Sequence, residues 1–492
     1  MYPNVILVIL DSARRDAFGA YGATGGLTPN FDRLASEGAL LWDHQAAGSG
    51  SAQAHVSTFS GQHSARHRMV HNLCDVPPDL WTLSSMLKGL GYSTYGHSKA
   101  SFIPPAGHED LFQFDELVYP GKATVTRAPG SMRDSGLDLL RKWPAAFNGL
   151  KSAYRAIAGR ERQVEAAARY FDGHSSFRYL RDRLIAAKGK APVFAYTTVL
   201  HPHTPYFPPR AFRQRVMGQS GVHPGAIDIQ LNFHGYMNGD LGEAPEAMAA
   251  LQQLYLADLC YGDDQLGVFT KELADAGVLD NSILIVTSDH GEMFGEHGII
   301  NHGATVWREL FETPCLIRYP KVVPAGTVVR RLTSALDFVP TVLSWIGQLE
   351  AVRGTTPFDG QPVCLDPGTD DRALVLDSPP AVLPERFKKF PNTLYKLSVL
   401  HRAVRTSEYK YHWISNGERY LWPVGVPETP DASRLAAEPG VADALHRRME
   451  AFYEAVSPGY NIREYPVAIS KSVGARMTNP VVREELKRLG YM

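Results

Sequence analysis

Two adjacent residues, Asp289 and His290, carry the clearest chemical signal in the sequence. They follow Ser282-Ile-Leu-Ile-Val286, a continuous apolar run of the length expected for a fully buried parallel strand. Open α/β sheets place their chemistry at the carboxyl ends of such strands, and the following Gly291 permits a sharp turn. A carboxylate beside an imidazole can bind a metal ion there. Taken alone, the pair fits equally well a helix-capping aspartate beside a hydrogen-bonded histidine.

Asp11 repeats this pattern near the start of the chain. It directly follows an apolar run over residues 4–10, which predicts a first buried strand with an aspartate at its reactive tip. An ordinary cap of the next segment is the alternative interpretation. The apolar run has no basic segment before it and is too short for a membrane span or a signal-peptide core. We therefore expect a soluble, cytoplasmic protein with no membrane partner.

Ser51 is the candidate nucleophile. It lies in a stretch of small and hydroxyl residues, residues 48–61, with a glycine before it and a predicted helix after it. A serine at a helix start has its hydroxyl near backbone N–H groups and a positive dipole end, which suits attack on an anionic group. By itself, a polar loop with an ordinary helix cap explains this segment better.

The composition excludes several classes of protein. The chain has 492 residues, 44% of them hydrophobic and 21% charged, which predicts two or three domains or one large α/β domain with an appendage. A net charge of −1 leaves no global footprint for nucleic acid. The four cysteines form no CxxC pair, which argues against a zinc knuckle or disulfide framework and is compatible with a reducing compartment.

A series of motifs in fixed order carries a family resemblance. The chain resembles the sulfatase branch of the alkaline phosphatase superfamily, and is most similar to members that open with Asp-Ser rather than Asp-Asp. The resemblance runs from residue 4 to about residue 455. Its motifs are Leu10–Asp16, Thr28–Leu34, Ser51-x3-His55-x-Ser57-x3-Gly61, Gly91–Thr94, His201–Tyr206, Tyr261–Gln265, Ser288–Glu292, Asp337–Thr341 and Arg405–Lys410.

The resemblance implies an α/β fold, an alkaline-phosphatase-like three-layer α/β/α sandwich with a large, mostly parallel sheet and a small C-terminal α+β subdomain. We expect residues 1–385 to form the catalytic domain, with a helical insertion at about 120–190 and an active-site loop at about 207–247. Residues 386–492 would form the C-terminal subdomain with antiparallel strands, a helix over residues 439–456 and a tail. The basic insertion is a solvated face or a lid over an anionic substrate. We expect the tail to pack either on the body of the protein or on a neighbouring subunit, so a homo-oligomer is possible.

The resemblance also implies a site for one divalent metal ion. Its ligands would be Asp11, Ser51, Asp289 and His290. Sulfatases of the Asp-Asp type have a second aspartate where this chain has Ser12, and often an asparagine where it has His290. Both changes lower the number of oxygen ligands, so we expect manganese or zinc in preference to calcium.

Four further residues fall where the family places groups that serve the transferred anion. His203 resembles the histidine that contacts the substrate anion or leaving group, and His302 occupies the family's Lys/His position for the same anion. His55 replaces an arginine and would orient the nucleophile or touch the anion. Lys99 falls at the family's lysine, although Ser101 replaces the usual histidine after it.

The segment around Ser51 departs from the family at the point that decides the chemistry. Sulfatases with formylglycine carry Cys or Ser followed by x-Pro-x-Arg, whereas this chain reads Ser51-Ala-Gln-Ala-His55, so we expect no formylglycine. A phosphoserine can be hydrolysed by attack at phosphorus, but a sulfoserine has no easy exit. We therefore predict a metal-dependent hydrolase that cleaves small phosphate (mono- or diester) or phosphonate esters through a covalent Ser51 intermediate.

Three alternatives remain beside this prediction. The first is sulfate ester hydrolysis, which the family resemblance favours. The second is transfer of a phosphoryl-type group to an acceptor alcohol, although the chain lacks the membrane spans of the superfamily members that do this. The third is a non-catalytic relative, against which the retention of Asp11, Ser51, Asp289 and His290 argues.

Overall fold

The computed structural model describes residues 2–70, 74, 76–98, 109–118, 125–126, 164–165, 173–219, 221–242, 245–354, 356–366, 368, 371–381, 397–459 and 461. Most of the predicted insertion at about 120–190, Lys99, and nearly all of the predicted tail lie outside the described residues.

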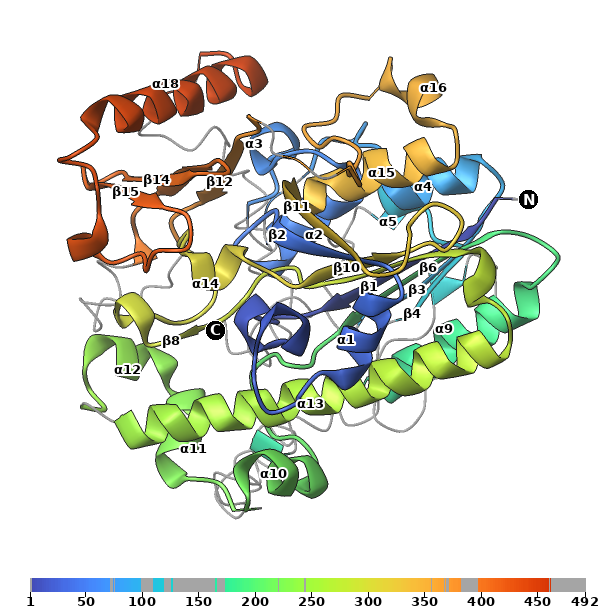
Figure 1. The fold of residues 1–492 in the computed structure, drawn as a ribbon, viewed down its shortest axis with the longest axis horizontal. Coiled ribbons are helices and arrows are strands. Elements are labelled where there is room, and N and C mark those ends of the chain that lie inside the picture. The colour runs from blue at the N-terminus through green and yellow to red at the C-terminus, as the bar shows by residue number, and fades with distance from the viewer. Residues whose placement is uncertain are drawn as a thin grey trace, which may run out of the picture.

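A nine-stranded sheet runs through the centre of the described structure (Figure 1). Parallel pairing joins β7, β1, β6, β3 and β4, and also β11 to β2, whereas β10 and β5 pair antiparallel. The sheet is therefore mostly parallel, as predicted. In spatial order its strands are β11 (Thr327–Ser334), β2 (Ala39–Gln45), β10 (Cys315–Arg318), β7 (Ser282–Thr287), β1 (Asn4–Leu10), β6 (Val193–Val199), β3 (Ser93–Ser98), β4 (Glu116–Val118) and β5 (Val125–Thr126).

Both faces of this sheet are covered, which explains why its central strands are continuous apolar runs. In β1, Ile6 and Val8 belong to one hydrophobic core, while Leu7 and Ile9 belong to a second core on the opposite face. The first core includes side chains of α1 (Pro29–Ser36), α9 (His174–Ala187) and α13 (Pro245–Asp275). The second includes side chains of α2 (Ser51–Ser60), α4 (Leu83–Gly89) and α15 (Phe338–Trp345). The predicted three-layer α/β/α sandwich is thus confirmed.

A smaller antiparallel sheet lies toward the C-terminus. Its four strands are, in order, β12 (Leu374–Ser378), β13 (His401–Arg405), β14 (Tyr409–Ile414) and β15 (Arg419–Pro423). Helix α18 (Pro439–Val456) packs Met449 and Tyr453 into a core shared with Val404 and Tyr411 of this sheet. The sheet begins before the predicted boundary at residue 386, because β12 pairs with β13. The division into two domains remains a prediction.

The segment at about 207–247, predicted as a loop, contains helices instead. These are α10 (Arg210–Met217), α11 (Pro224–Leu231), α12 (Phe233–Asn238) and the start of α13. Each of the first three spans about two turns, too short for an apolar period to stand out. Local caps define their ends: the Asn232 side chain accepts from Gly235 N, and Gly218 and Gly239 end α10 and α12 in the left-handed region.

Shorter elements complete the described chain. The remaining helices are α3 (Ser64–His67), α5 (Glu109–Phe112), α14 (Arg308–Phe311) and α16 (Leu349–Arg353), and a two-stranded ribbon pairs β8 (Met293–Phe294) with β9 (Ile300–Asn301). Single 3-10 turns lie at Arg15–Ala17, Gly19–Tyr21, Leu279–Asn281, Glu296–Gly298, Ala335–Asp337 and Pro430–Ala432. Among the described residues, no helix combines the length and the apolar character that crossing a membrane requires.

Candidate metal and nucleophile site

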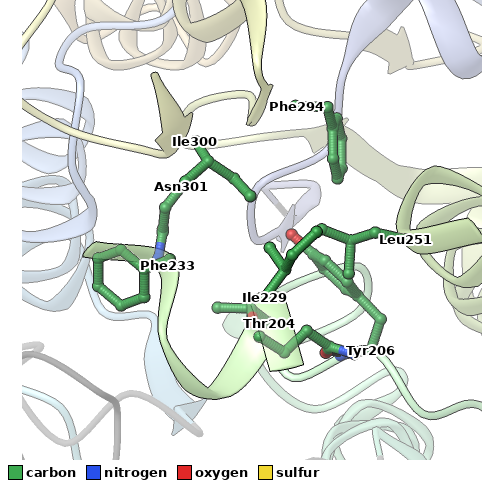
Figure 2. A pocket seen from close by; sticks show the side chains of 9 residues that line it. Thr204, Tyr206, Ile229, Phe233, Leu251, Phe294, Ile300 and Asn301 are labelled. Carbon is green, nitrogen blue, oxygen red and sulfur yellow. Dashed lines mark hydrogen bonds between the residues drawn. The ribbon is translucent and has the colours of Figure 1, made fainter. Parts of the chain in front are cut away.

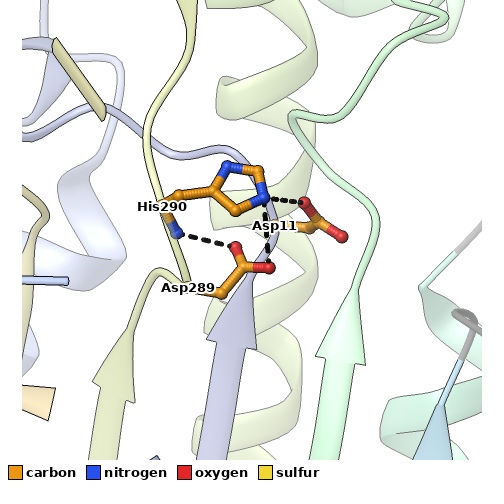
Figure 3. Close-up of side chains that lie close together, drawn as sticks. All are labelled: Asp11, Asp289 and His290. Atoms are coloured by element: carbon orange, nitrogen blue, oxygen red, sulfur yellow. Dashed lines mark hydrogen bonds and ion pairs between the residues drawn. The ribbon is translucent and has the colours of Figure 1, made fainter. Parts of the chain in front are cut away.

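Asp11 and Asp289 meet because β1 and β7 are neighbouring parallel strands. Ile9 pairs with Thr287 in the register of these strands, so the two aspartates follow at the same edge of the sheet. Figure 3 shows both carboxylates and the imidazole of His290 gathered beyond the strand ends. One ligand atom from each of the three residues lies within 4.8 Å of the others, and all three residues are buried. The sheet thus brings together the three charged or imidazole ligands that we expected.

Ser12 donates a hydrogen bond to one carboxylate oxygen of each aspartate, and the second oxygen of each has no donor among the described residues. Ser12 has a φ of 65°. Its backbone N–H donates to Asp289 Oδ1 (3.3 Å), and its hydroxyl donates to Asp11 Oδ1 (3.1 Å). Asp11 Oδ2 and Asp289 Oδ2 are buried and accept no hydrogen bond from the described residues. Buried carboxylate oxygens are costly unless a donor or cation meets them, so this arrangement fits a metal ion.

His290 presents a lone pair to the same place. Its Nδ1 donates to the Gly291 carbonyl (2.9 Å), so in the neutral ring Nε2 is the unprotonated nitrogen. Nε2 lies 3.5 Å from Asp289 Oδ2 and 3.8 Å from Asp11 Oδ1. Burial lowers the pKa of His290, which keeps the ring neutral. A neutral imidazole fixed by a hydrogen bond at its other nitrogen is the form in which histidine binds metals.

Gly291 allows the chain to turn after the Asp-His pair, as predicted, and its backbone lies close to α14. Its N–H donates to the Leu310 carbonyl (2.8 Å), and a Cβ atom at this position would overlap the Glu309 carbonyl oxygen. Only glycine lets the chain turn here against α14.

Ser51 completes the predicted set of four ligands. Its Oγ lies 3.0 Å from His290 Nε2, and the residue is the first of helix α2. Gly50 is the N-cap and contributes no side-chain cap, so the hydroxyl of Ser51 lies at the uncapped, positive end of the helix. Every residue of α2 is buried, which holds this end firmly. The helix start predicted for Ser51 is confirmed, and its hydroxyl faces His290, one of the three expected metal ligands beside it.

His55 lies one turn along α2, with both ring nitrogens engaged by the protein. Nδ1 donates to the Ser51 carbonyl (2.7 Å), and Nε2 is 2.8 Å from Thr198 Oγ1. Nδ1 is also 3.6 Å from Asp289 Oδ2. Of the two roles expected for His55, this geometry favours orientation of the nucleophile over contact with the anion.

The two remaining predicted histidines lie beside this cluster. The rings of His203 and His302 are 5.1 Å apart, and the ring of His302 is 4.2 Å from that of His290. His203 Nδ1 donates to the Thr204 carbonyl (2.5 Å). Burial is the largest influence on both rings and lowers the pKa of His203 and, to about 3, that of His302.

Glu292 and Tyr206 belong to this site although we assigned them no role from the sequence. The Tyr206 hydroxyl donates to Glu292 Oε2 (2.8 Å), and Glu292 Oε1 is 3.3 Å from His302 Nδ1. Burial raises the pKa of Glu292 to about 7. Both residues lie within the quoted motifs His201–Tyr206 and Ser288–Glu292, which was the available signal.

A small apolar pocket adjoins the site (Figure 2). Its volume of about 20 Å³ holds roughly one water molecule, so it is not a seat for a leaving group. Helices α11 and α12 contribute to its wall, as an active-site segment would. The lining residues are Thr204, Tyr206, Ile229, Gln230, Phe233, Leu251, Phe294, Ile300 and Asn301.

A larger cavity of about 430 Å³ is lined by charged residues from the Arg15–Ala17 turn, the Glu296–Gly298 turn, α14 and residues 427–429. Its arginines already face carboxylates: Arg14 pairs with Glu296 (2.6 Å), and Arg15 pairs with Glu312 (2.5 Å). Arg308 also reaches Glu312. The five carboxylates that line this cavity outnumber its three arginines, so it does not suit a substrate anion.

Comparison with known proteins identifies the family of this chain. Residues 3–348 match the protein family described as Sulfatase. The chain belongs to the sulfatase family. It is therefore an ester hydrolase of the sulfatase and alkaline phosphatase superfamily. Sulfatases depend on a divalent metal ion, and Asp11, Asp289 and His290 form a matching donor set in this one.

Individual relatives of this sulfatase-family chain are distant. It is 24% identical to the choline-sulfatase of Rhizobium meliloti (strain 1021) over 379 residues, which cover 72% of this chain and 70% of that protein. The phosphonate monoester hydrolase of Agrobacterium radiobacter superposes with a TM-score of 0.65 at 19% identity, covering 92% of this chain and 96% of that one. Another solved structure is that of a protein in complex with its substrate D-glucosamine-2-N,6-O-disulfate. It superposes with a TM-score of 0.64 at 17% identity, covering 93% of this chain and 99% of that one. At such identities the solved structures establish the fold.

Proposed function

We propose that this sulfatase-family enzyme hydrolyses small phosphate or phosphonate esters through a covalent intermediate on Ser51. The observation that carries the proposal is the position of Ser51 Oγ, 3.0 Å from His290 Nε2 at the start of α2. The sequence after it, Ala-Gln-Ala-His55, lacks the Pro and Arg of the formylglycine signal. The nucleophile is then an ordinary serine, and the group transferred to it must be one that water can remove.

A phosphoryl group on Ser51 is one that water can remove. The Ser51 oxygen attacks phosphorus, the bond from phosphorus to the leaving oxygen breaks, and that oxygen takes up a proton as the alcohol departs. Water then attacks phosphorus in line, the bond to Ser51 breaks, and the serine regains its proton. A sulfoserine offers no comparable second step, because formylglycine enzymes release sulfate through a hemiacetal that a plain serine cannot form.

We assign the roles of the surrounding residues from their positions. Asp11, Asp289, His290 and Ser51 would hold one divalent metal ion, which when bound stabilises the ionised serine and withdraws charge from the transferred group. The mixed donor set of carboxylate, imidazole and hydroxyl groups favours manganese or zinc over calcium. His203 and His302 would serve the transferred anion and the leaving oxygen, and His55 would orient Ser51.

Sulfate ester hydrolysis is the second candidate. The family match and the choline-sulfatase relative favour it. It requires either that Ser51 is converted to formylglycine or that water hydrolyses the sulfate ester of Ser51 directly. The two candidates differ in the state of Ser51 and in the preferred ester.

A cytoplasmic location also remains part of the proposal. All four cysteines are free thiols, and Cys74, Cys260 and Cys315 are buried while Cys364 is exposed. Unpaired thiols suit a reducing compartment.

An ester panel tests the function. Purified protein with added manganese should release nitrophenol from aryl phosphate or phosphonate esters faster than from aryl sulfate. A preference for sulfate would overturn the first candidate in favour of the second. Ser51→Ala should abolish turnover, whereas the matched change Ser60→Ala, in another buried serine of α2, should retain it. Mass analysis of the Ser51 peptide should show unmodified serine.

A further inference from the structure

The carboxyl group of Glu292 lies between Tyr206 and His302, and all three side chains are buried. Tyr206 is 3% exposed and Glu292 is 0% exposed. The tyrosine hydroxyl donates to Glu292 Oε2 (2.8 Å), while the carboxyl oxygens lie 3.3 and 3.4 Å from His302 Nδ1. The glutamate is thus anchored on one side by a hydroxyl donor and faces the imidazole with both oxygens.

His302 is held at its backbone as well. It follows β9, and Asn301, at a φ of 76°, accepts from the His302 N–H through its side-chain oxygen (2.9 Å). This hydrogen bond anchors the backbone of the residue, and the imidazole ring faces the carboxyl group of Glu292 through Nδ1. The ring lies 4.2 Å from that of His290, so a small rotation changes which atoms reach the reacting group.

A carboxylate that faces Nδ1 of a histidine defines the rotation and the tautomer of the imidazole ring. It selects the tautomer with the proton on Nδ1 and fixes the plane of the ring, so that Nε2 becomes the nitrogen offered to other groups. Tyr206 in turn prevents the carboxylate from turning toward another partner. Tyr206 therefore holds Glu292, and Glu292 holds the ring of His302.

We propose that Glu292 is a positioning residue that acts through His302, with Tyr206 holding the carboxylate in place. This inference rests on the proposed function, because His302 is the group that serves the transferred anion or leaving oxygen. A glutamate that merely fills the core would lower stability when changed. A positioning glutamate lowers turnover only while His302 is present.

A double-mutant cycle separates these outcomes. With manganese and a nitrophenyl ester, Glu292→Gln should lower kcat by about 10- to 100-fold with KM changed by less than about threefold. His302→Ala should lower kcat as well, and Glu292→Gln should cause no further loss in that background. Equal losses from Glu292→Gln in both backgrounds would overturn the proposal, as would a loss explained by reduced bound manganese or a lowered melting temperature.

Matched variants keep the cycle specific. Glu309→Gln changes a glutamate whose side chain is 13% exposed and lies beside another histidine, His297, and it should leave kcat within about twofold. Tyr206→Phe should cause a smaller loss than Glu292→Gln, and this loss should also disappear in the His302→Ala background. If Tyr206→Phe still lowers kcat in the His302→Ala background, the tyrosine does not act through Glu292 and His302, and the proposal is contradicted.

A spectroscopic measurement is independent of the substrate. In zinc-loaded protein with ¹⁵N-labelled histidine, His302 should show the tautomer protonated at Nδ1, and Glu292→Gln should diminish that form. A His302 ring protonated at Nε2 in the unmodified protein would overturn the inference. If the protein cleaves no ester but shows the expected tautomer, the proposed function fails while the positioning contact stands.

Discussion

The side-chain amide of Gln53 donates a hydrogen bond to the carboxylate of Asp377, at 2.9 Å, and joins the nucleophile helix to the first strand of the C-terminal sheet. The oxygen of the same Gln53 side chain accepts a hydrogen bond from the backbone N–H of Ser49 (3.2 Å). Ser64 and Tyr453 also donate to Asp377. Gln53 stands where sulfatases with formylglycine have proline, so this chain uses that position to tie the serine loop to the C-terminal sheet.

Loss of this tie should destabilise the protein. Gln53→Ala removes hydrogen bonds to a buried carboxylate that keeps its partners Ser64 and Tyr453, so we expect the free energy of unfolding to fall by about 1–3 kcal/mol. Urea denaturation followed by fluorescence measures this change. Gln348→Ala, in a partly exposed glutamine bonded to Tyr2, is the control and should cost less than about 1 kcal/mol. If both variants lower the free energy of unfolding equally, the hydrogen bond between Gln53 and Asp377 has no special role in stability.

Metal removal should lower both activity and stability. Two buried carboxylate oxygens, Asp11 Oδ2 and Asp289 Oδ2, lack donors among the described residues, and a bound cation would give both of them a partner. A metal present at about 100 times its dissociation constant stabilises the fold by roughly 2.7 kcal/mol. Chelated protein should therefore melt at a lower temperature and recover with manganese. Asp289→Asn should abolish this recovery, while Asp275→Asn, exposed on α13, should retain it.

The choice of metal should depend on residues 12 and 290. Ser12→Asp together with His290→Asn restores the oxygen-rich pattern of the Asp-Asp sulfatases, and an aspartate tolerates the φ of 65° at residue 12. We expect calcium to raise the melting temperature of this double variant more than manganese does. The unmodified protein should show the opposite order. A double variant that still responds more strongly to manganese would show that these two residues do not set the preference.

Acid should destabilise the protein through buried neutral histidines such as His44. Burial, with smaller contributions from Arg372 and Arg15, lowers the pKa of His44 from 6.5 to about 3. Between these values the unfolded chain binds a proton that the folded chain does not. Stability therefore falls as the pH drops below 6.5, by about 2 kcal/mol from this one residue at pH 5.

His44→Phe tests this contribution, because the ring stacks on Phe338 and phenylalanine preserves that contact. The free energy of unfolding of the variant should fall less between pH 7 and pH 5 than that of the unmodified protein, by about 2 kcal/mol. Denaturant titrations at the two pH values measure the difference. Parallel pH profiles for the two proteins would mean that His44 is not protonated on unfolding.

Elements with strong local patterns were predictable. The continuous apolar runs before Asp11 and Asp289 form β1 and β7, and the amphipathic run at the C-terminal end of the described chain forms α18 with the predicted limits. The sequence pattern does not predict the three short helices between residues 210 and 238. Each is stabilised by caps and neighbours rather than by an apolar period, so local pattern contains little trace of them.

The candidate site likewise has features that the sequence predicts and features that it does not. The sequence by itself determined the types of its groups, because an aspartate or serine at the end of a strand or the start of a helix is visible locally. Only the tertiary structure decided which groups meet. The pairing of β1 with β7 sets Asp11 beside Asp289, and contacts across 86 and 324 residues connect Tyr206 to Glu292 and Gln53 to Asp377. Such contacts depend on how strands and helices pack, which single-residue spacing does not encode.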